Sequence, residues 1–330
     1  MPEVVEVHKY ADMIKKHTRG HILKDIEILN GRYKKHGSFE GFNDLIKMKG
    51  EIIVNDVSAK GKLIYITFQK KVKDNDNEKD HELIYLISTL GLSGGWTFSS
   101  DEYDNTIEKQ DEQTLTKTIK RYDIPQVIEF IGAPTQKAWK IKMLRHLNVC
   151  FTFPHGNLYF FDMLSFGTLK LLKTQAQLDK KLNEIGADIL DDTTTAETFI
   201  ERLRKKTLEH KLIGNVVVNQ KIISGVGNYL RADGLWMSKI SPHHTVSSLS
   251  DENLTTIYKS FRRLVVGDYN YDHAIHLGLI TKSIKIPRDY KRDFFVYRQS
   301  TDIDGNPVKT EEMYEGSQKR TIFWCPAVQK

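Results

Sequence analysis

The chain has 330 residues, of which 39% are hydrophobic and 28% are charged, a composition typical of a soluble globular protein with more than one domain. Lysine and arginine outnumber aspartate and glutamate by 49 to 43, which gives a formal net charge of +6. This mild excess permits a polyanionic partner such as nucleic acid but does not require one.

The chain contains 2 cysteines, Cys150 and Cys325, which lie far apart in the sequence. This small number argues against a disulfide framework and against a four-ligand zinc site, and it fits a reducing, intracellular setting. Charged residues interrupt the start of the chain, so a signal peptide is not expected. No stretch approaches the ~20 apolar residues that span a bilayer.

The first part of the chain is predicted to form one helix followed by β structure. Residues 2–18 fit a helix, since proline is tolerated at the first helical position. An incomplete apolar stripe supports this helix: Val4, Val5, Tyr10, Ala11 and Ile14. Residues 21–160 are expected to be β structure, with strands in 62–68 and 82–89 joined by a charged hairpin loop. A second hairpin is predicted where "PHGN" separates "NVCFTF" from "LYFFD".

Beyond about residue 168 the pattern becomes helical. The segment "LSDENLTTIYKSFRRLV" predicts an amphipathic helix whose N-cap is Ser250. Its apolar face is expected to consist of Leu254, Ile257, Tyr258, Phe261, Leu264 and Val265. The end of the chain is predicted to return to strands, "FFVYRQ" and "KRTIFWC", around a "DGNP" turn.

The most informative segment is "NQKIISGVGNYLRADGLW", residues 219–236. Gly225 and Gly227 permit a positive φ and a close backbone approach, and Asn228 stands where a helix N-cap would stand. The unpaired N–H groups at the start of such a helix form a phosphate site. Short glycine turns are common, so on the pattern alone a plain helix–turn–helix corner without a ligand is the simpler explanation of the same residues.

The segment "ISGVGNYLRADGLW" resembles the helix–two-turn–helix motif of the formamidopyrimidine-DNA glycosylase and endonuclease VIII family, which repairs oxidised bases in DNA. Its "GNYLRA" continuation is more similar to the endonuclease VIII branch. Further segments resemble the family in the expected order: "MPE…EV", "GKLIYI", "LGLSG", "FDMLSFG", "SSLSDENL" and "QKRTIFWCPAVQK". The resemblance therefore covers nearly the whole chain.

The resemblance implies an α+β fold with two domains. An N-terminal β-sandwich preceded by a short helix would occupy residues 1–167, and a linker would follow over 168–185. A helical domain with the helix–two-turn–helix motif would occupy 186–290, and a β-hairpin finger 291–330. Only one cysteine matches the metal-binding pattern of the finger, so a zinc-less finger is expected. Its shape would come from aromatic packing by Phe294, Phe295, Phe323 and Trp324.

The implied reaction starts at the N-terminus. In such enzymes the initiator methionine is removed, so Pro2 would carry a free secondary amine. A terminal amine has a pKa of about 8, so an appreciable fraction is neutral and nucleophilic. Pro2 is then expected to form a Schiff base at C1′ of the damaged nucleotide, with Glu3 as general acid/base and β,δ-elimination to follow. Taken alone, Met-Pro is also an unremarkable start of a chain.

The resemblance also assigns a catalytic lysine. Lys62 directly precedes an apolar strand, where its ammonium would reach a DNA phosphate or the sugar oxygen. Lys60 is a rival, and both lysines are also explained as strand-edge residues that discourage aggregation. Glu6 resembles a family position that lines the base pocket. No cofactor and no metal are implied.

The family binds DNA with phosphate contacts and with side chains that fill the hole left by the extruded base. Asn228 and Arg320 are expected to hold phosphates, and Leu92 and Phe166 to fill the hole. The family often carries an Arg-Arg pair before this phenylalanine, whereas this chain has Leu164 and Ser165. Discrimination of the base opposite the lesion is therefore expected to be relaxed.

These features predict a bifunctional DNA glycosylase with lyase activity on abasic sites, acting in base excision repair. We expect it to act as a monomer on damaged double-stranded or single-stranded DNA, with no membrane association, and to prefer oxidised pyrimidines. The alternatives are a protein that recognises lesions without cutting, an RNA-binding or structural protein with the same helix–turn geometry, and a glycosylase for oxidised purines.

Overall fold

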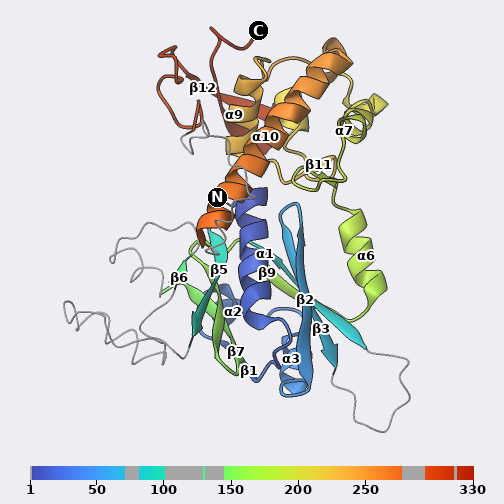
Figure 1. Cartoon of the computed structure of the whole chain (residues 1–330), viewed down its shortest axis with the longest axis vertical. Helices are drawn as coiled ribbons and strands as arrows, with labels where there is room; N and C mark the ends of the chain where they lie inside the picture. Colours follow the sequence, from blue (N-terminus) through green and yellow to red (C-terminus); the bar gives the residue numbers. More distant parts are fainter. Residues whose placement is uncertain (1, 71–81, 101–128, 131–144, 277–293, 316–317) are drawn as a thin grey trace, which may run out of the picture. The chain divides into compact units, whose positions relative to one another are not determined.

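The computed structural model of the protein describes residues 2–70, 82–100, 129–130, 145–276, 294–315 and 318–330 (Figure 1). The chain divides into two compact units. The first unit contains Met1–Pro2 and Glu6–Lys181, and the second contains Glu3–Val5 and Leu182–Lys330. The first is built on β-sheets and the second on helices and a β-hairpin, which confirms the predicted α+β fold with two domains.

Two antiparallel sheets form the first unit. The larger has the order β1-β7-β8-β5-β6: β1 (Asp25–Ile28), β7 (Leu147–Phe153), β8 (Gly156–Asp162), β5 (Gly94–Ser100) and β6 (Glu129–Phe130). The smaller has the order β2-β3-β4-β9: β2 (Ile52–Lys60), β3 (Leu63–Lys70), β4 (Leu83–Thr89) and β9 (Thr168–Leu172). Buried residues from both sheets join a single hydrophobic core, so the unit is a β-sandwich.

Helix α1 (Val4–Thr18) confirms the predicted N-terminal helix, although it begins at Val4 rather than Pro2. Val4 and Val5 belong to the hydrophobic core of the second unit, whereas later residues of α1 belong to the core of the first. There α1 packs on the larger sheet, where Tyr10 contacts Phe161 edge to face and His17 stacks on Phe98.

The predicted hairpins are present, with two additions in the region expected to be β structure. The "PHGN" segment joins β7 to β8, and Phe153 pairs with Gly156 across the turn. Most of the charged loop after β3 lies outside the described residues. Two short helices, α2 (Gly31–His36) and α3 (Phe42–Lys47), interrupt the β structure. Helices of this length span fewer than two turns, which is too short to produce a periodic pattern.

The second unit is built from helices. These are α6 (Gln175–Asn183) at its boundary, α7 (Ala196–Leu203), α8 (Ile213–Val216), α9 (Asn228–Met237) and α10 (Asp251–His276), with 3₁₀ turns at Lys206–Leu208 and Val246–Ser248. The strands β10 (Ala187–Asp188) and β11 (Ile223–Ser224) form a short parallel pair. β9 and α6 occupy much of the segment expected as a linker.

Helix α10 confirms the predicted amphipathic helix. The buried residues of its apolar face are Leu254, Ile257, Phe261, Leu264 and Val265, while Tyr258 is half-buried. Ser250 is the predicted cap, since its hydroxyl accepts a hydrogen bond of 3.1 Å from the backbone N–H of Asn253. The predicted helix start is therefore correct.

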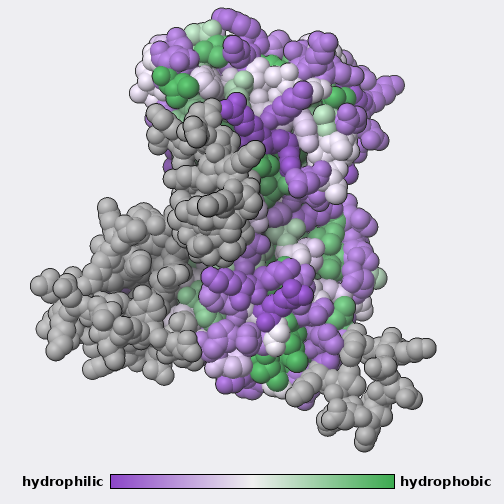
Figure 2. All heavy atoms as spheres, viewed as in Figure 1, coloured by the Kyte–Doolittle hydropathy of each residue, from purple (hydrophilic) through white to green (hydrophobic). Residues whose placement is uncertain are grey.

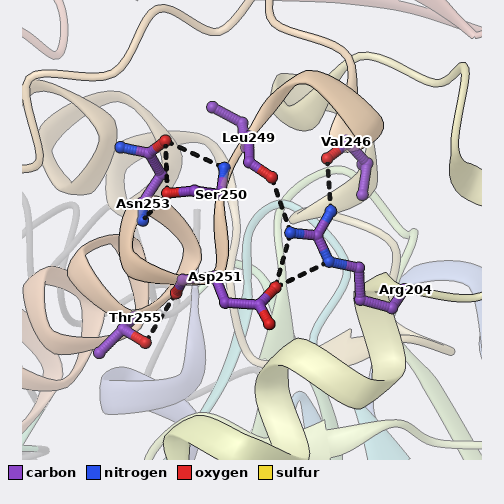
Figure 3. A network of polar contacts seen from close by, with 7 residues as sticks. All are labelled: Arg204, Val246, Leu249, Ser250, Asp251, Asn253 and Thr255. Atoms are coloured by element: carbon purple, nitrogen blue, oxygen red, sulfur yellow. Dashed lines mark hydrogen bonds and ion pairs between the residues drawn. The ribbon is translucent and has the colours of Figure 1, made fainter.

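An arginine network joins the end of α7 to the start of α10 (Figure 3). Arg204 donates to the Asp251 carboxylate from Nε at 2.9 Å and from Nη2 at 2.6 Å. It also donates to the carbonyl oxygens of Val246 at 3.0 Å and Leu249 at 2.7 Å. One side chain thus satisfies carbonyl groups of the segment that leads into α10.

The C-terminal hairpin consists of β12 (Lys309–Glu315) and β13 (Gln318–Trp324). The prediction that "FFVYRQ" is the first strand of this hairpin was wrong, because β13 pairs with residues 309–315 instead. The "DGNP" turn closes a smaller loop, in which the buried Asp302 carboxylate accepts from the N–H groups of Asp304 at 3.0 Å and Asn306 at 2.8 Å. The indole N–H of Trp236 donates to the same carboxylate at 3.2 Å. The Asp302 carboxylate thus stabilises this part of the finger through these hydrogen bonds.

The aromatic residues expected to shape the finger differ in their environments. Phe295 and Phe323 pack against the core of the second unit, and Trp324 contacts His243 edge to face. Phe294 is exposed, although its ring lies 5.5 Å from that of Tyr229. Packing and the Asp302 hydrogen bonds therefore act together in this segment.

Candidate functional site

Glu3 caps the start of helix α9. Its side chain is fully buried, and its carboxylate accepts hydrogen bonds from the N–H groups of Gly227 at 2.8 Å, Tyr229 at 2.9 Å and Leu230 at 3.3 Å. The positive end of the helix dipole favours a carboxylate at this place. The backbone N–H of Val4 donates to the carbonyl of Gly225 at 3.2 Å, which adds a second anchor.

The structure differs from three expectations about the helix start. The N-cap of α9 is Gly227 rather than Asn228, which is the first helical residue. Gly225 has the expected positive φ of 96°, but Gly227 has a φ of −126°. The N–H groups of Gly227, Tyr229 and Leu230, expected to bind phosphate, are occupied by Glu3.

The other N-terminal candidates lie in the first unit. Pro2 is half-buried and is bonded directly to Glu3. Glu6, in the first turn of α1, is also half-buried. The two residues between the strands of the β2–β3 hairpin are Gly61 and Lys62. Gly61 has a φ of 56°, so Lys62 lies at the tip of a tight turn rather than inside a strand.

Lys60, the rival lysine, ends β2 and pairs with Leu63 across the hairpin. Both Lys60 and Lys62 are half-buried. The two candidate lysines thus stand on either side of Gly61, one at the end of β2 and one in the hairpin turn.

The structure brings Asn228 and Arg320 together around a residue that the sequence interpretation did not assign, Arg231. Arg231 donates to the side-chain oxygen of Asn228 and, at 2.7 Å, to the carbonyl of Thr321, the neighbour of Arg320 on β13. Burial, together with the positive charge of Arg320, lowers the pKa of Arg231 to about 10. The signal in the sequence was the spacing of Asn228 and Arg231, which places both on one helix face.

The two candidate intercalation loops form one apolar surface, here called the plug. Its exposed side chains are Leu92 (48% exposed), Met163 (40%), Leu164 (56%) and Phe166 (59%). The loops touch, since a Cβ atom on Gly91 would lie 2.7 Å from the backbone of Phe166. The predicted residues Leu92 and Phe166 therefore belong to a single surface, to which Met163 and Leu164 are additions.

A buried carboxylate holds the two plug loops together. Asp162 accepts from the Ser93 hydroxyl at 2.6 Å, from the Leu164 N–H at 3.1 Å and from the Gly167 N–H at 2.6 Å. The Leu164 N–H also donates to the Ser93 hydroxyl at 2.8 Å. Ser165 adopts a φ of 60°, a left-handed conformation that is uncommon outside glycine and costs roughly 1 kcal/mol. The hydrogen bonds around Asp162 stabilise this turn.

Helix α2 fixes the second plug loop from its other side. Arg32 donates to the carbonyl of Ser165 at 3.4 Å and to that of Gly167 at 3.2 Å. The hydroxyl of the next residue, Tyr33, accepts from the Leu169 N–H at 2.6 Å. The backbone of the loop is thus hydrogen-bonded to Asp162 on one side and to α2 on the other, while its apolar side chains face outward.

The described residues contain no group of three or more His, Cys, Asp or Glu side chains that could hold a metal ion. Within the same residues, no helix has both the length and the apolar character needed to cross a membrane. On the face that Figure 2 displays, hydrophobic residues form separate spots among hydrophilic ones.

Three domains of one family match the chain in order. Residues 1–169 match the formamidopyrimidine-DNA glycosylase N-terminal domain, residues 185–269 its H2TH domain and residues 282–330 its C-terminal domain. Endonuclease 8 of Pectobacterium atrosepticum is 29% identical over 45% of this chain and 53% of its own length. The chain thus matches about half the length of this relative. The formamidopyrimidine-DNA glycosylase of Rickettsia felis is 30% identical over 72% of this chain and 80% of its own length.

The fold is also similar to solved structures. A crystal structure of the Lactococcus lactis formamidopyrimidine-DNA glycosylase, bound non-covalently to DNA with an abasic site, superposes with a TM-score of 0.66. The two chains are 18% identical, and the superposition covers 99% of each. The domain matches and the Rickettsia relative together show that this chain belongs to the formamidopyrimidine-DNA glycosylase family.

Proposed function

We propose that the protein is a DNA glycosylase of base excision repair that also cleaves abasic sites, with Pro2 as its nucleophile. The observation that carries this proposal is the capping of α9 by Glu3, the residue bonded to Pro2. A buried carboxylate with several N–H partners has one fixed position, so the preceding residue is confined as well. Relatives named formamidopyrimidine-DNA glycosylase and Endonuclease 8 support the reaction class.

The proposed reaction uses the Pro2 nitrogen after removal of Met1. The neutral amine attacks C1′ of the damaged nucleotide, and the C1′–N bond to the base breaks with its electron pair leaving on the base. Opening of the sugar gives an iminium ion between Pro2 and C1′. Because this cation withdraws electrons, a proton leaves C2′ and the 3′ phosphate departs by β-elimination. A second elimination then releases the 5′ phosphate, and water hydrolyses the iminium ion.

Glu3 is the proposed general acid/base. The carboxylate belongs to the residue bonded to Pro2, and three backbone N–H groups of α9 and its N-cap fix its position. Its negative charge also favours the cationic iminium ion on the neighbouring residue.

The proposed DNA contacts divide between phosphate binding and base replacement. Asn228, Arg320 and Lys62 bind phosphates, which predicts an affinity that falls steeply with salt. The plug fills the space that the extruded base leaves in the duplex, and Leu92 and Phe166 are its central members. Leu164 has no hydrogen-bonding group where the family often has arginine, so the opposite base is read weakly.

Oxidised pyrimidines in duplex or single-stranded DNA are the proposed substrates, by the similarity of "GNYLRA" to the endonuclease VIII branch. Oxidised purines are the second candidate, because the match to the formamidopyrimidine-DNA glycosylase of Rickettsia felis covers more of both chains than the match to Endonuclease 8. Excision from a panel of duplexes that carry single defined lesions separates the two. We propose that the protein acts as a monomer without a cofactor.

Borohydride trapping tests the reaction. The wild-type protein is expected to form a covalent adduct with DNA that contains an abasic site, because reduction converts the iminium ion to a stable amine. Pro2→Gly, or an N-terminal tag that stays attached, should reduce or abolish the adduct. Binding to the same DNA without any adduct or strand cleavage would favour the alternative of a lesion-recognising protein that does not cut.

A further inference from the structure

Arg231 is a buried cation without a carboxylate among its hydrogen-bond acceptors. Its side chain is 1% exposed, and its donors reach the carbonyl of Gly214 at 3.2 Å, the carbonyl of Thr321 at 2.7 Å and the side-chain oxygen of Asn228. Its Nε is buried and has no acceptor among the described residues. The acceptors come from α8, from β13 and from the first residue of α9.

Such a side chain is costly for stability alone. A buried charge whose hydrogen bonds all go to neutral groups is costly to desolvate, and an apolar side chain of similar size often fills such a site more favourably. The nearby charge of Arg320 adds repulsion, and that of Glu3 offsets part of it. The geometry around Arg231 therefore calls for a role beyond packing.

The first consequence concerns the side chain of Asn228. A guanidinium group has only donors, so the atom of Asn228 that faces Arg231 is its oxygen. The amide nitrogen, with two N–H donors, then points away from Arg231. It has no acceptor among the described residues, and Asn228 is half-buried. Such a pair of donors is suited to a phosphate oxygen.

The second consequence concerns the backbone of the finger. The same Nη2 atom that binds Asn228 also donates to the Thr321 carbonyl. Thr321 follows Arg320, which is exposed on β13. One nitrogen of Arg231 thus fixes both the amide of Asn228 and the strand that carries Arg320.

We propose that Arg231 is a positioning residue that couples the two phosphate-binding side chains: it presents the amide donors of Asn228 and holds the β13 backbone beside Arg320. This inference rests on the proposed function, since it assumes that Asn228 and Arg320 bind DNA phosphates. The negative charge of a phosphate would also relieve the repulsion between the two arginines.

A double-mutant cycle tests the coupling. Binding is measured with a duplex that contains a tetrahydrofuran abasic-site analogue, which cannot be cleaved, over a range of salt concentrations. Arg231→Met and Asn228→Ala should each weaken binding about tenfold and flatten the salt dependence. The double variant should bind no worse than Arg231→Met alone, because loss of Arg231 already removes the contribution of Asn228. Additive losses, about a hundredfold in the double variant, would overturn the inference.

Arg204→Met is the matched control, since it removes a structural arginine of the same unit (Figure 3). It should lower the melting temperature but leave the affinity for DNA unchanged. Combined with Asn228→Ala, it should give the same affinity as Asn228→Ala alone. A loss of binding as large as that of Arg231→Met would show that any weakening of this unit has the same effect, and it would contradict a positioning role.

Two further variants cover the case in which Arg231→Met fails to fold. Asn228→Asp keeps an acceptor for Arg231 but has no donor for phosphate, so it should fold stably and bind as weakly as Asn228→Ala. Arg231→Lys keeps the charge but loses the planar fork, and binding should remain impaired. Wild-type affinity in either variant would refute the inference. Borohydride trapping of the wild-type protein is scored separately, so a failure of the proposed reaction is distinguished from a failure of the coupling.

Discussion

The plug loops of the first unit and the contact of Asn228 with β13 in the second unit each depend on a buried charged side chain, and the two charges have opposite sign. Asp162 accepts hydrogen bonds from N–H and O–H groups of two loops whose outward side chains are apolar. Arg231 donates to oxygens of three segments and orients a polar side chain. The Asp162 carboxylate therefore fixes the shape of the plug loops, whereas the Arg231 guanidinium orients the amide donors of Asn228.

Because of this difference, loss of Asp162 and loss of Arg231 are expected to impair different steps. Loss of Asp162 should affect the step that opens the duplex, because only that step needs a side chain to replace the base. Loss of Arg231 should affect phosphate binding, which depends on salt. In both regions hydrogen bonds within the protein fix the geometry, so less conformational entropy is lost when DNA binds.

The largest effect is expected from Asp162→Ala. Without the carboxylate, the Gly167 N–H loses its acceptor, the Leu164 N–H keeps only the Ser93 hydroxyl, and the plug loops lose their fixed shape. Excision from duplex DNA should fall about a hundredfold, or roughly 3 kcal/mol, in single-turnover experiments. Cleavage of single-stranded abasic DNA should change less than threefold.

Asp25→Asn is the control for this prediction. Asp25 is an exposed carboxylate that pairs with Lys49 at 2.8 Å on the same unit, so its loss should leave both rates unchanged. An equal fall of the duplex and single-strand rates in Asp162→Ala would show that Asp162 supports the whole unit rather than the plug.

Another buried carboxyl, that of Asp233, sharpens the comparison by its dependence on pH. Burial raises the pKa of Asp233 to about 6, although the N–H groups of Val296 and Tyr297 donate to it at 2.9 and 3.0 Å. A carboxyl whose pKa is raised on folding adds stability below its unfolded pKa of about 4, and this contribution is lost as the pH rises through about 6.

The wild-type protein should therefore lose on the order of 2 kcal/mol relative to Asp233→Asn between pH 4 and pH 7. The asparagine oxygen accepts the same N–H bonds but does not titrate in this range. Denaturant unfolding of both proteins at several pH values measures the difference. A constant difference across this range would mean that Asp233 is already ionised without cost.

A smaller effect is expected from Leu164→Arg, which returns a hydrogen-bonding group to the plug. The wild-type protein should remove the same lesion at similar rates opposite each of the four bases. The variant should gain roughly tenfold discrimination among them, the size expected for one good contact between arginine and a base. Leu164→Met is the control and should stay indiscriminate. Strong discrimination in the wild-type protein would contradict the role of the apolar plug.

Elements with a local signal could be predicted from the sequence. The β7–β8 hairpin has a turn between two runs of β-branched and aromatic residues, and α10 has both an apolar stripe and a serine cap. The strand β12 was missed because "KTEEMYE" is mostly polar, as a two-stranded hairpin with little buried surface permits. The aromatic run 294–299 suggested a strand but packs without forming one.

The candidate site could be predicted in part. The family resemblance pointed to Glu3 and Asn228, yet their partners depend on contacts between distant segments. Glu3 binds N–H groups that lie 224 to 227 residues later in the chain. Arg231 is part of the "GNYLRA" segment, but its hydrogen bond to Thr321 depends on the packing of β13 beside α9, which the sequence does not reveal. Asp162 and Ser93 were likewise unassigned, because their hydrogen bond joins two loops.

The most direct test of the proposed reaction is mass spectrometry of the borohydride-trapped complex after proteolysis. The proposal predicts an N-terminal peptide that begins at Pro2 and carries the sugar remnant on its terminal nitrogen. A peptide that still begins with Met1, or a remnant attached to Lys62 or another side chain, would contradict it.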